Sequence, residues 1–162
     1  MRYILKHKLL SIGGDSMIKD EHGQDVYFVD GAAISLGRRL TIKDMKGEHL
    51  AVIQQQIIAL TPTFEIEETH GVKAHLSMKL LSLIDHLKID VSGGDDLEAH
   101  GDIFHHEYSI DRGGRTVAQI SKAWIAITDS YGIEIDDQED QVLLLSCAVV
   151  IDAILELREH AH

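Results

Sequence analysis

Paired basic residues are the side chains of this sequence best suited to bind a phosphate group. Arg38 stands next to Arg39, and Lys43 stands three residues before Lys46. Guanidinium groups match phosphate oxygens with parallel hydrogen bonds, and lysine supplies a compact positive charge. Arg38, Arg39 and Lys43 are therefore candidates for a lipid-phosphate site. The alternative is a solvated strand surface, which the formal net charge of −12 favours because it weakens attraction to anionic lipid.

Residues that could catalyse a reaction give weaker signals. Gly14-Asp15-Ser16 is similar to the opening of one esterase motif, but no Asp-x-x-His follows in the last third of the chain. A nucleophilic serine needs a base and donors for the oxyanion. The eleven histidines form no HExxH motif, and paired cysteines are absent from the sequence. The sequence therefore predicts a non-enzymatic domain without catalytic residues, with an unrecognised hydrolase as an alternative.

An acidic group precedes the last hydrophobic run of the chain. Its members are Asp129, Asp136, Asp137, Glu139 and Asp140. Asp136 as N-cap, with Glu139 at the third helical position, fits a variant of the capping box, and acids in a first helical turn complement the helix dipole. Consecutive carboxylates on one turn converge poorly on a cation that needs six to eight oxygens. We interpret this group first as a helix cap.

The hydrophobic run after the acidic group must form the core of the protein. Over residues 142–157, aliphatic side chains cover every direction of a helix in the first half, and such a helix must be buried in lipid or protein. A bilayer span needs about 20 apolar residues, and this shorter run contains Asp152 and Glu156. The sequence predicts no transmembrane span. It predicts a buried helix whose last turns emerge with Asp152, Glu156 and Glu159 facing outward.

The rest of the chain predicts strands that could wrap this helix. Glycines follow polar residues at 24-residue intervals, at Gly23, Gly47 and Gly71, as hairpin turns require. Between turn signals lie thirteen runs typical of strands, namely Tyr3–Leu10, Ser16–Lys19, Asp25–Asp30, Leu36–Lys43, His49–Gln55, Phe64–Glu68, Lys73–Leu80, Leu87–Val91, Leu97–Gly101, Phe104–Ile110, Thr116–Lys122, Trp124–Thr128 and Gly132–Ile135. An antiparallel meander of this length can close into a barrel. Trp124 is expected in its core.

Composition limits the class of protein. The chain has 162 residues, which suits one domain over 1–162. Its acidic charge weighs against nucleic-acid binding. Cys147, the single cysteine, lies in the hydrophobic run, where we expect a buried unreactive thiol. The N-terminus has no secretory apolar segment, so we expect a cytoplasmic protein.

Longer segments carry a family resemblance. Residues 101–155, residues 9–31 and residues 40–56 are similar to the LURP-one-related family of the Tubby C-terminal-like superfamily, to which phospholipid scramblases are distantly related. The resemblance implies a mainly β fold, a closed antiparallel 12-stranded Tubby-like barrel around a central hydrophobic C-terminal helix. Tubby itself binds phosphoinositides, whereas the family has no settled activity.

The resemblance also suggests which ligands this protein could bind. Scramblase-like relatives place a calcium-responsive acidic segment before the C-terminal helix, and the acidic group here matches that location but not a strict ligand pattern. Calcium is therefore an alternative to capping, and no other cofactor is expected. The leading hypothesis is a binding or interaction domain for phospholipid head groups, another amphiphile or an unknown protein partner, with peripheral membrane contact. The alternative is a calcium-responsive, scramblase-like module.

Overall fold

The computed structural model describes residues 1–7, 15–34, 37–56, 63–77, 86–125 and 129–160. Within these ranges it contains twelve strands, one short 3-10 helix and one α-helix. The elements are β1 (Arg2–Lys6), β2 (Ser16–Asp20), β3 (Asp25–Ile34), β4 (Gly37–Asp44), β5 (His49–Gln56), β6 (Thr63–Glu68), β7 (Lys73–Ser77), β8 (His86–Ser92), β9 (Leu97–Asp102), η1 (Ile103–His105), β10 (Glu107–Arg112), β11 (Arg115–Ser121), β12 (Ser130–Ile135) and α1 (Gln141–His160).

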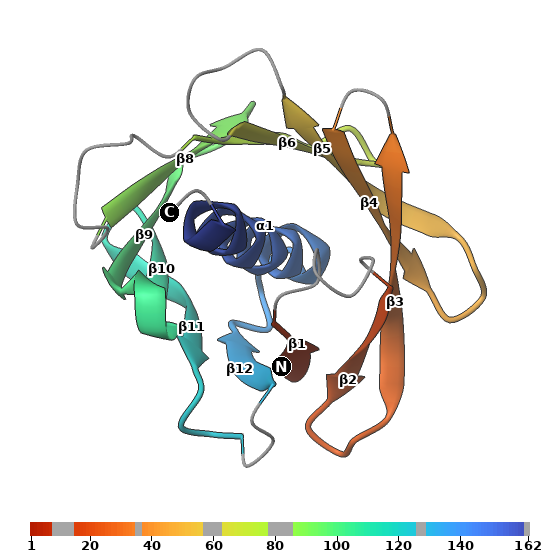
Figure 1. Cartoon of the computed structure of the whole chain (residues 1–162). Coiled ribbons are helices and arrows are strands. Elements are labelled where there is room, and N and C mark those ends of the chain that lie inside the picture. Colours follow the sequence, from red (N-terminus) through yellow and green to blue (C-terminus); the bar gives the residue numbers. More distant parts are fainter. Residues whose placement is uncertain (8–14, 35–36, 57–62, 78–85, 126–128, 161–162) are drawn as a thin grey trace.

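The strands close into an antiparallel barrel around α1, which confirms the predicted fold class (Figure 1). Each strand pairs with its neighbours in the chain, and β1 closes the ring by pairing with β12 from Arg2 opposite Glu134 to Lys6 opposite Ser130. Closure gives every strand two partners, so no strand of the barrel is left as an exposed edge.

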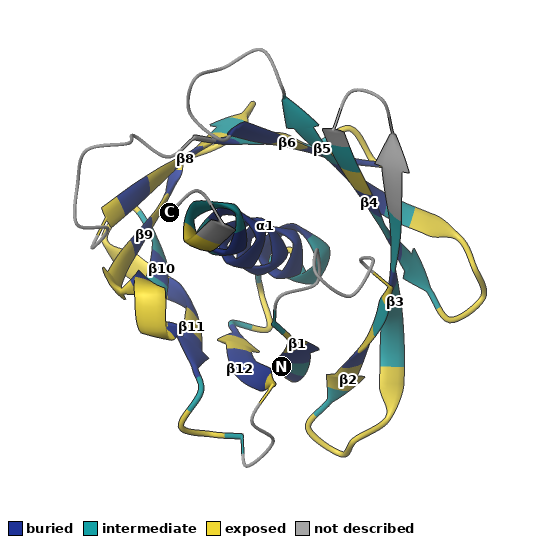
Figure 2. Ribbon diagram, viewed as in Figure 1, coloured by how far each residue is buried: buried dark blue, intermediate teal, exposed yellow. Residues whose placement is uncertain are grey.

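The helix fills the barrel because its middle is apolar on all sides. From Leu143 to Ile154 every residue of α1 is buried, and Val150 is fully enclosed (Figure 2). Inward-facing strand residues such as Ile42, Ile53 and Phe64 supply the matching wall. The prediction of a helix buried in protein is confirmed. Among the described helices, none has the length and apolar character that crossing a bilayer requires.

The start of the helix differs from the prediction. Asp140 is the residue whose carboxylate accepts a hydrogen bond from the Leu143 N–H, at 3.1 Å, and α1 begins at the next residue. The predicted cap, Asp136, instead accepts from the Gln138 N–H at 2.9 Å and closes a turn between β12 and α1. Several consecutive acids can each cap a backbone N–H, so the sequence pattern did not distinguish between them.

Two predicted strands were also wrong in part. Phe104 lies in η1, because the Asp102 carboxylate accepts the His105 N–H and the backbone turns at His106 before β10 begins. Trp124 and Ile125 form a turn rather than the start of a strand, and residues 126–128 of that run lie outside the described residues. The predicted ends at Leu10 and Leu80 lie outside them as well.

Trp124 is not a core residue. Its side chain is 38% exposed, and the Arg2 guanidinium lies 4.8 Å from its ring centre. The indole packs near Gly132 of β12, on the outside of the barrel, where a Cβ at position 132 would approach it within 3.1 Å. The prediction of a core tryptophan is therefore wrong, because the indole covers an outer surface of the barrel.

Short turns gather at one end of the barrel, which we call the turn end. These turns lie at residues 21–24, 45–48, 69–72, 93–96 and 113–114, and α1 begins at the same end. Gly23 and Gly47 adopt positive φ angles of 80° and 88°, as the glycine spacing predicts. In both turns the preceding aspartate, Asp20 or Asp44, accepts two backbone N–H groups.

Candidate ligand-binding site

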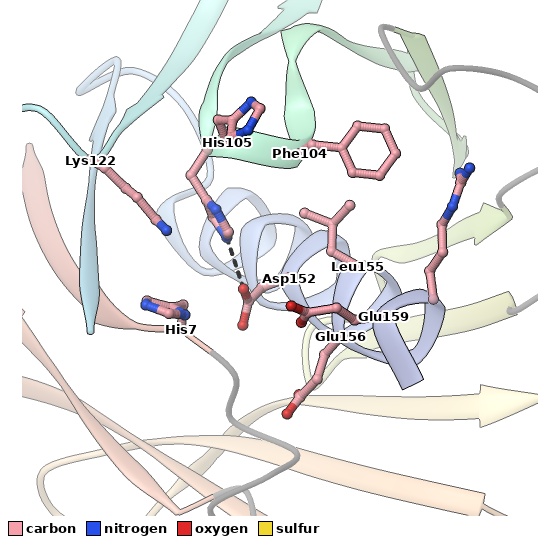
Figure 3. Close-up of a pocket in the computed structure, with 10 residues that line it drawn as sticks. His7, Phe104, His105, Lys122, Asp152, Leu155, Glu156 and Glu159 are labelled. Carbon is pink, nitrogen blue, oxygen red and sulfur yellow. Dashed lines mark hydrogen bonds and ion pairs between the residues drawn. The ribbon is translucent and has the colours of Figure 1, made fainter. Parts of the chain in front are cut away.

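A pocket of about 530 Å³ lies at the opposite end of the barrel, which we call the pocket end (Figure 3). It is formed by the last turns of α1, by η1, and by the residues that follow β1 and β11. The lining residues are His7, Phe104, His105, His106, Lys122, Asp152, Leu155, Glu156, Arg158 and Glu159. The pocket therefore combines charged groups of both signs with an apolar wall.

A buried hydrogen bond between a histidine and a carboxylate lies in the wall of the pocket. His106 Nε2 is 2.8 Å from Asp152 Oδ1, and the two side chains are 7% and 4% exposed. His106 has a φ of 55°, and no other non-glycine residue in the described part of the chain has a positive φ. Its Nδ1 is buried and has no hydrogen-bond partner among the described residues. Backbone strain together with an unsatisfied buried polar atom makes this position a candidate functional site.

The acidic side chains of the helix end are not where the sequence predicted them. Asp152 and Glu156 are only 3% and 2% exposed and line the pocket, whereas Glu159 is exposed as expected. The prediction failed because it assumed that the last turns of the helix leave the barrel, whereas Asp152 and Glu156 are still enclosed. Two acids spaced four residues apart in a hydrophobic helix were the available signal of a buried polar site.

Aromatic rings pack around the His106–Asp152 hydrogen bond. The His106 ring lies 4.9 Å from the Tyr131 ring and 5.8 Å from the His7 ring, measured between centres. Tyr131 donates to the Ala148 carbonyl at 3.4 Å, while the buried Tyr108 hydroxyl has no partner among the described residues. Burial, followed by the charge of Asp152, raises the pKa of both tyrosines well above the usual value. Both phenols therefore remain neutral hydrogen-bonding groups.

Two cationic side chains line the pocket in different ways. The Arg158 guanidinium lies 5.0 Å from the centre of the Phe104 ring, a cation–π contact. Lys122 points into the space between His7 and Asp152 (Figure 3), and its ammonium makes no ion pair with any described carboxylate. An ammonium group that faces a pocket without an ion pair is available to an anionic ligand.

The predicted phosphate residues are not brought together. Arg38 and Arg39 lie near the start of β4, at the pocket end, but outside the pocket lining. As neighbours in a strand they face opposite sides of the sheet. Lys43 lies near the other end of β4, where its ammonium bonds to Asp30 at 2.7 Å. A phosphate site on these three residues remains a prediction.

The predicted acidic group is divided among several partners. Asp129 pairs with Lys6 at 3.5 Å, near the pocket end. At the turn end, Asp137 pairs with the N-terminal amine, and Asp136 pairs with Arg115 at 2.8 Å. Glu139 accepts from Arg112 and Arg115 at 2.9 and 3.0 Å.

Asp140, the last member, caps α1 and lies beside Glu68. Across the described ranges, no three metal-ligating side chains are placed to share an ion. Calcium binding by the acidic group remains a prediction.

Glu68, which the sequence did not single out, is buried at the turn end. It is 6% exposed, and its Oε2 has no partner among the described residues. Burial, together with hydrogen bonding to Asp140 and its charge, raises the pKa of Glu68 to about 8. The two carboxyl groups are therefore held together through a proton.

Neither candidate nucleophile has a catalytic environment. Burial raises the pKa of the Cys147 thiol to about 12, in agreement with the expected unreactive cysteine. The Ser16 hydroxyl donates to the Met17 carbonyl at 3.4 Å, and no bond to a histidine is found for it among the described residues.

Comparison with known proteins identifies the family. The LURP-one-related family model matches residues 1–152. The chain belongs to the LURP-one-related family. Among relatives, the chain is 28% identical over 151 residues to the uncharacterized protein YxjI of Bacillus subtilis (strain 168), an alignment that covers 93% of this chain and 91% of that protein.

A solved structure supports the fold of this family member. An X-ray structure of a protein from Arabidopsis thaliana matches with a TM-score of 0.62 and 13% identity, covering 94% of this chain and 90% of that one. At this level of identity the match supports the barrel architecture and carries no functional information.

Proposed function

We propose that this protein is a non-enzymatic binding domain that takes the head group of an amphiphile, such as a phospholipid, into the pocket at the pocket end. The observation that carries this proposal is the composition of the pocket. Phe104 and Leu155 supply an apolar wall, Lys122 and Arg158 supply cations, and Glu159 supplies an exposed acid. A concave surface that combines an apolar wall with charged groups of both signs suits the head group and the adjoining methylene groups of an amphiphile.

The rigidity of the scaffold supports binding. The pocket wall is attached to a closed barrel and to a helix with a fully enclosed centre, so little conformational entropy is lost when a ligand enters. The backbone that carries Lys122 is also held in place, because the Glu107 carboxylate accepts hydrogen bonds from the N–H groups of Lys122 and Ala123 at 3.0 and 3.3 Å. The ammonium of Lys122 is thus presented from an anchored segment.

Sedimentation with lipid vesicles tests the proposal. The full chain is mixed with vesicles of phosphatidylcholine and phosphatidylethanolamine, with and without phosphatidylserine, at low and at physiological salt. We expect the protein to pellet with vesicles, and Lys122→Ala to reduce the bound fraction several-fold. Lys88→Ala is the matched control, since Lys88 is exposed on the outer surface of β8, where it pairs with Asp90 and Asp96.

Two results would overturn the proposal. One is the absence of vesicle binding even at low salt, where electrostatic attraction is strongest. The other is equal loss of binding in Lys122→Ala and Lys88→Ala, which would indicate non-specific adhesion of the whole surface rather than use of the pocket.

A further inference from the structure

Two histidines lie directly opposite each other on the outer wall of the barrel, where β8 pairs with β9 (Figure 1). His86 of β8 is the register partner of His100 of β9, and their side chains are 56% and 46% exposed. Their chain neighbours Leu87 and Ala99 are buried in the core, so both imidazoles face outward. We infer that this histidine pair binds a divalent transition-metal ion such as Zn²⁺ or Cu²⁺. The inference is independent of the proposed function, because neither histidine lines the pocket.

The strand register brings the two rings within reach of one ion. Directly opposite residues of an antiparallel pair have Cβ atoms about 4.5–5.5 Å apart. The bond from Zn²⁺ to an imidazole nitrogen is about 2.0–2.1 Å long, so two rings that start this close can bind the same ion. Imidazole suits Zn²⁺, Ni²⁺ and Cu²⁺, of which Cu²⁺ binds most tightly. No three metal-ligating side chains of the described ranges are placed to share an ion, so the pair supplies two ligands and water completes the coordination.

Each histidine has a carboxylate beside one of its ring nitrogens. Asp111 Oδ2 lies 2.6 Å from His100 Nε2, and Glu98 Oε1 lies 3.1 Å from His86 Nδ1. A carboxylate at one nitrogen favours the neutral ring with its proton on that nitrogen, and this leaves the lone pair of the other nitrogen for a metal. The nitrogens assigned to the ion are therefore His86 Nε2 and His100 Nδ1.

The charge around the histidine pair favours a cation. Glu98 and Asp111 are direct partners on β9 and β10, and neither forms an ion pair with a lysine or arginine among the described residues. Lys88 lies opposite Glu98 on β8. Its ammonium instead pairs with Asp90 and Asp96, at 3.5 and 3.6 Å. A divalent ion bound by the two histidines therefore meets two carboxylates that no fixed cation neutralises.

Isothermal titration calorimetry of the full chain with Zn²⁺ tests this site. We expect one ion per chain in the tightest binding step, and we expect His86→Asn or His100→Asn to weaken that step at least tenfold. Both side chains are exposed, so the variants should fold normally, which circular dichroism checks. His75→Asn is the matched control, because His75 is 45% exposed on the neighbouring β7 but lies opposite Asp90 rather than another histidine.

Asp111→Asn tests the role of the neighbouring carboxylate. Without the carboxylate at Nε2, the His100 ring is less strongly oriented, and we expect Zn²⁺ to bind about tenfold more weakly. Glu65→Gln is the control, since Glu65 stands 4.0 Å from His75 and should not affect the ion. Electron paramagnetic resonance of bound Cu²⁺ gives a second measurement, in which the wild type should show coupling to two imidazole nitrogens and His100→Asn to one.

Two results would overturn the inference. If the double variant His86→Asn/His100→Asn binds Zn²⁺ as tightly as the wild type, the wild type holds an adventitious ion only, at another position. If His75→Asn weakens binding as much as His86→Asn, exposed histidines bind the metal without a defined site. Vesicle binding that depends on Lys122 would survive either result, so this inference and the proposed function fail separately.

Discussion

The two ends of this barrel are built in opposite ways. At the turn end, five tight turns join the strands, and Arg112 and Arg115 neutralise Glu139 at the start of the helix. At the pocket end, a hydrogen bond between His106 and Asp152 is buried beside a pocket, and His106 Nδ1 and the Tyr108 hydroxyl lack partners among the described residues, whereas at the turn end this holds for Glu68 Oε2 alone. Both ends enclose the same helix, so the difference does not come from the core.

We interpret this difference as a division of roles, in which the turn end stabilises the fold and the pocket end binds a ligand. At the turn end most charged and backbone groups are satisfied by nearby residues, which is what a stabilising structure requires. The pocket end keeps a histidine in a positive-φ conformation, which costs free energy that the surrounding structure must offset. We therefore expect substitutions at the turn end to change mainly stability, and substitutions at the pocket end to change mainly binding.

The largest expected effect comes from a substitution in the core that both ends of the barrel share. Val150→Asp places an unpaired charge at the centre of the helix, where the side chain is fully buried. We expect a loss of more than about 4 kcal/mol, enough to unfold the domain, measured by circular dichroism and thermal denaturation. Val150→Ala is the control and should remain folded with a loss of about 1–3 kcal/mol. A folded Val150→Asp protein would contradict the buried position of the helix.

The next largest loss of stability is expected from a substitution at the turn end. Glu139→Ala leaves two arginines without their shared carboxylate, whose side chain is only 9% exposed. We expect a loss of about 2–4 kcal/mol in urea denaturation, with ligand binding unchanged. Glu134→Ala removes an exposed pair with Arg2 on the outer surface and should cost less than about 1 kcal/mol. Equal losses in the two variants would show that the turn end gains nothing from its buried network.

The Glu68–Asp140 pair makes the turn end sensitive to pH. Because the pKa of Glu68 is raised to about 8, folding holds a proton that the unfolded chain releases near pH 4.5. The contribution of this group to stability is therefore fully present below pH 4.5, is lost as the pH rises from 4.5 to about 8, and changes no further above that pH. Glu68→Gln should remove this dependence and stabilise the protein by about 1–3 kcal/mol at pH 9, since one pKa unit corresponds to about 1.4 kcal/mol.

Denaturation at pH 5 and pH 9 measures this effect. Glu67→Gln is the matched control, because the neighbouring Glu67 is exposed and faces outward. The wild type and the control should both lose stability between the two pH values, and Glu68→Gln should not. A steep loss of stability in Glu68→Gln as well would place the titrating group elsewhere.

The smallest expected effect comes from replacing a turn glycine that has a positive φ. Gly47 has a φ of 88°, which an alanine adopts at a cost of about 1–2 kcal/mol. Gly47→Ala should therefore lower stability by that amount in thermal denaturation. Gly94→Ala is the control, because Gly94 is not among the glycines with positive φ and its added Cβ would meet Val91 at an ordinary 3.7 Å. If both substitutions are neutral, the turn end depends less on its glycines than we infer.

Much of the fold could be predicted from local patterns. Alternating strands, glycines spaced by 24 residues and an all-round apolar helix led to the barrel, which the structure confirms. The errors fell where several local solutions were equally good. Consecutive acids offered more than one cap, and Asp140 rather than Asp136 was used. The alternation of apolar and polar residues likewise did not predict the exposed Trp124 or the 3-10 helix at Phe104.

The candidate site could not be predicted in the same way. His106 and Asp152 are 46 residues apart, and neither lies in a motif with a recognised spacing. The sequence did not single out Lys122 or His7. It predicted phosphate ligands in Arg38, Arg39 and Lys43, which the structure does not bring together. Pocket residues converge only because the ring closes between the first and last strands.

The sequence by itself determined the periodicity of the strands, the positions of the tight turns and the need to bury the last helix, because each follows from the chemistry of neighbouring residues. Only the tertiary structure decided where the barrel wall ends relative to the helix. That relation places Asp152 and Glu156 inside a pocket rather than in solvent, because enclosure depends on strands from the whole chain meeting around one axis.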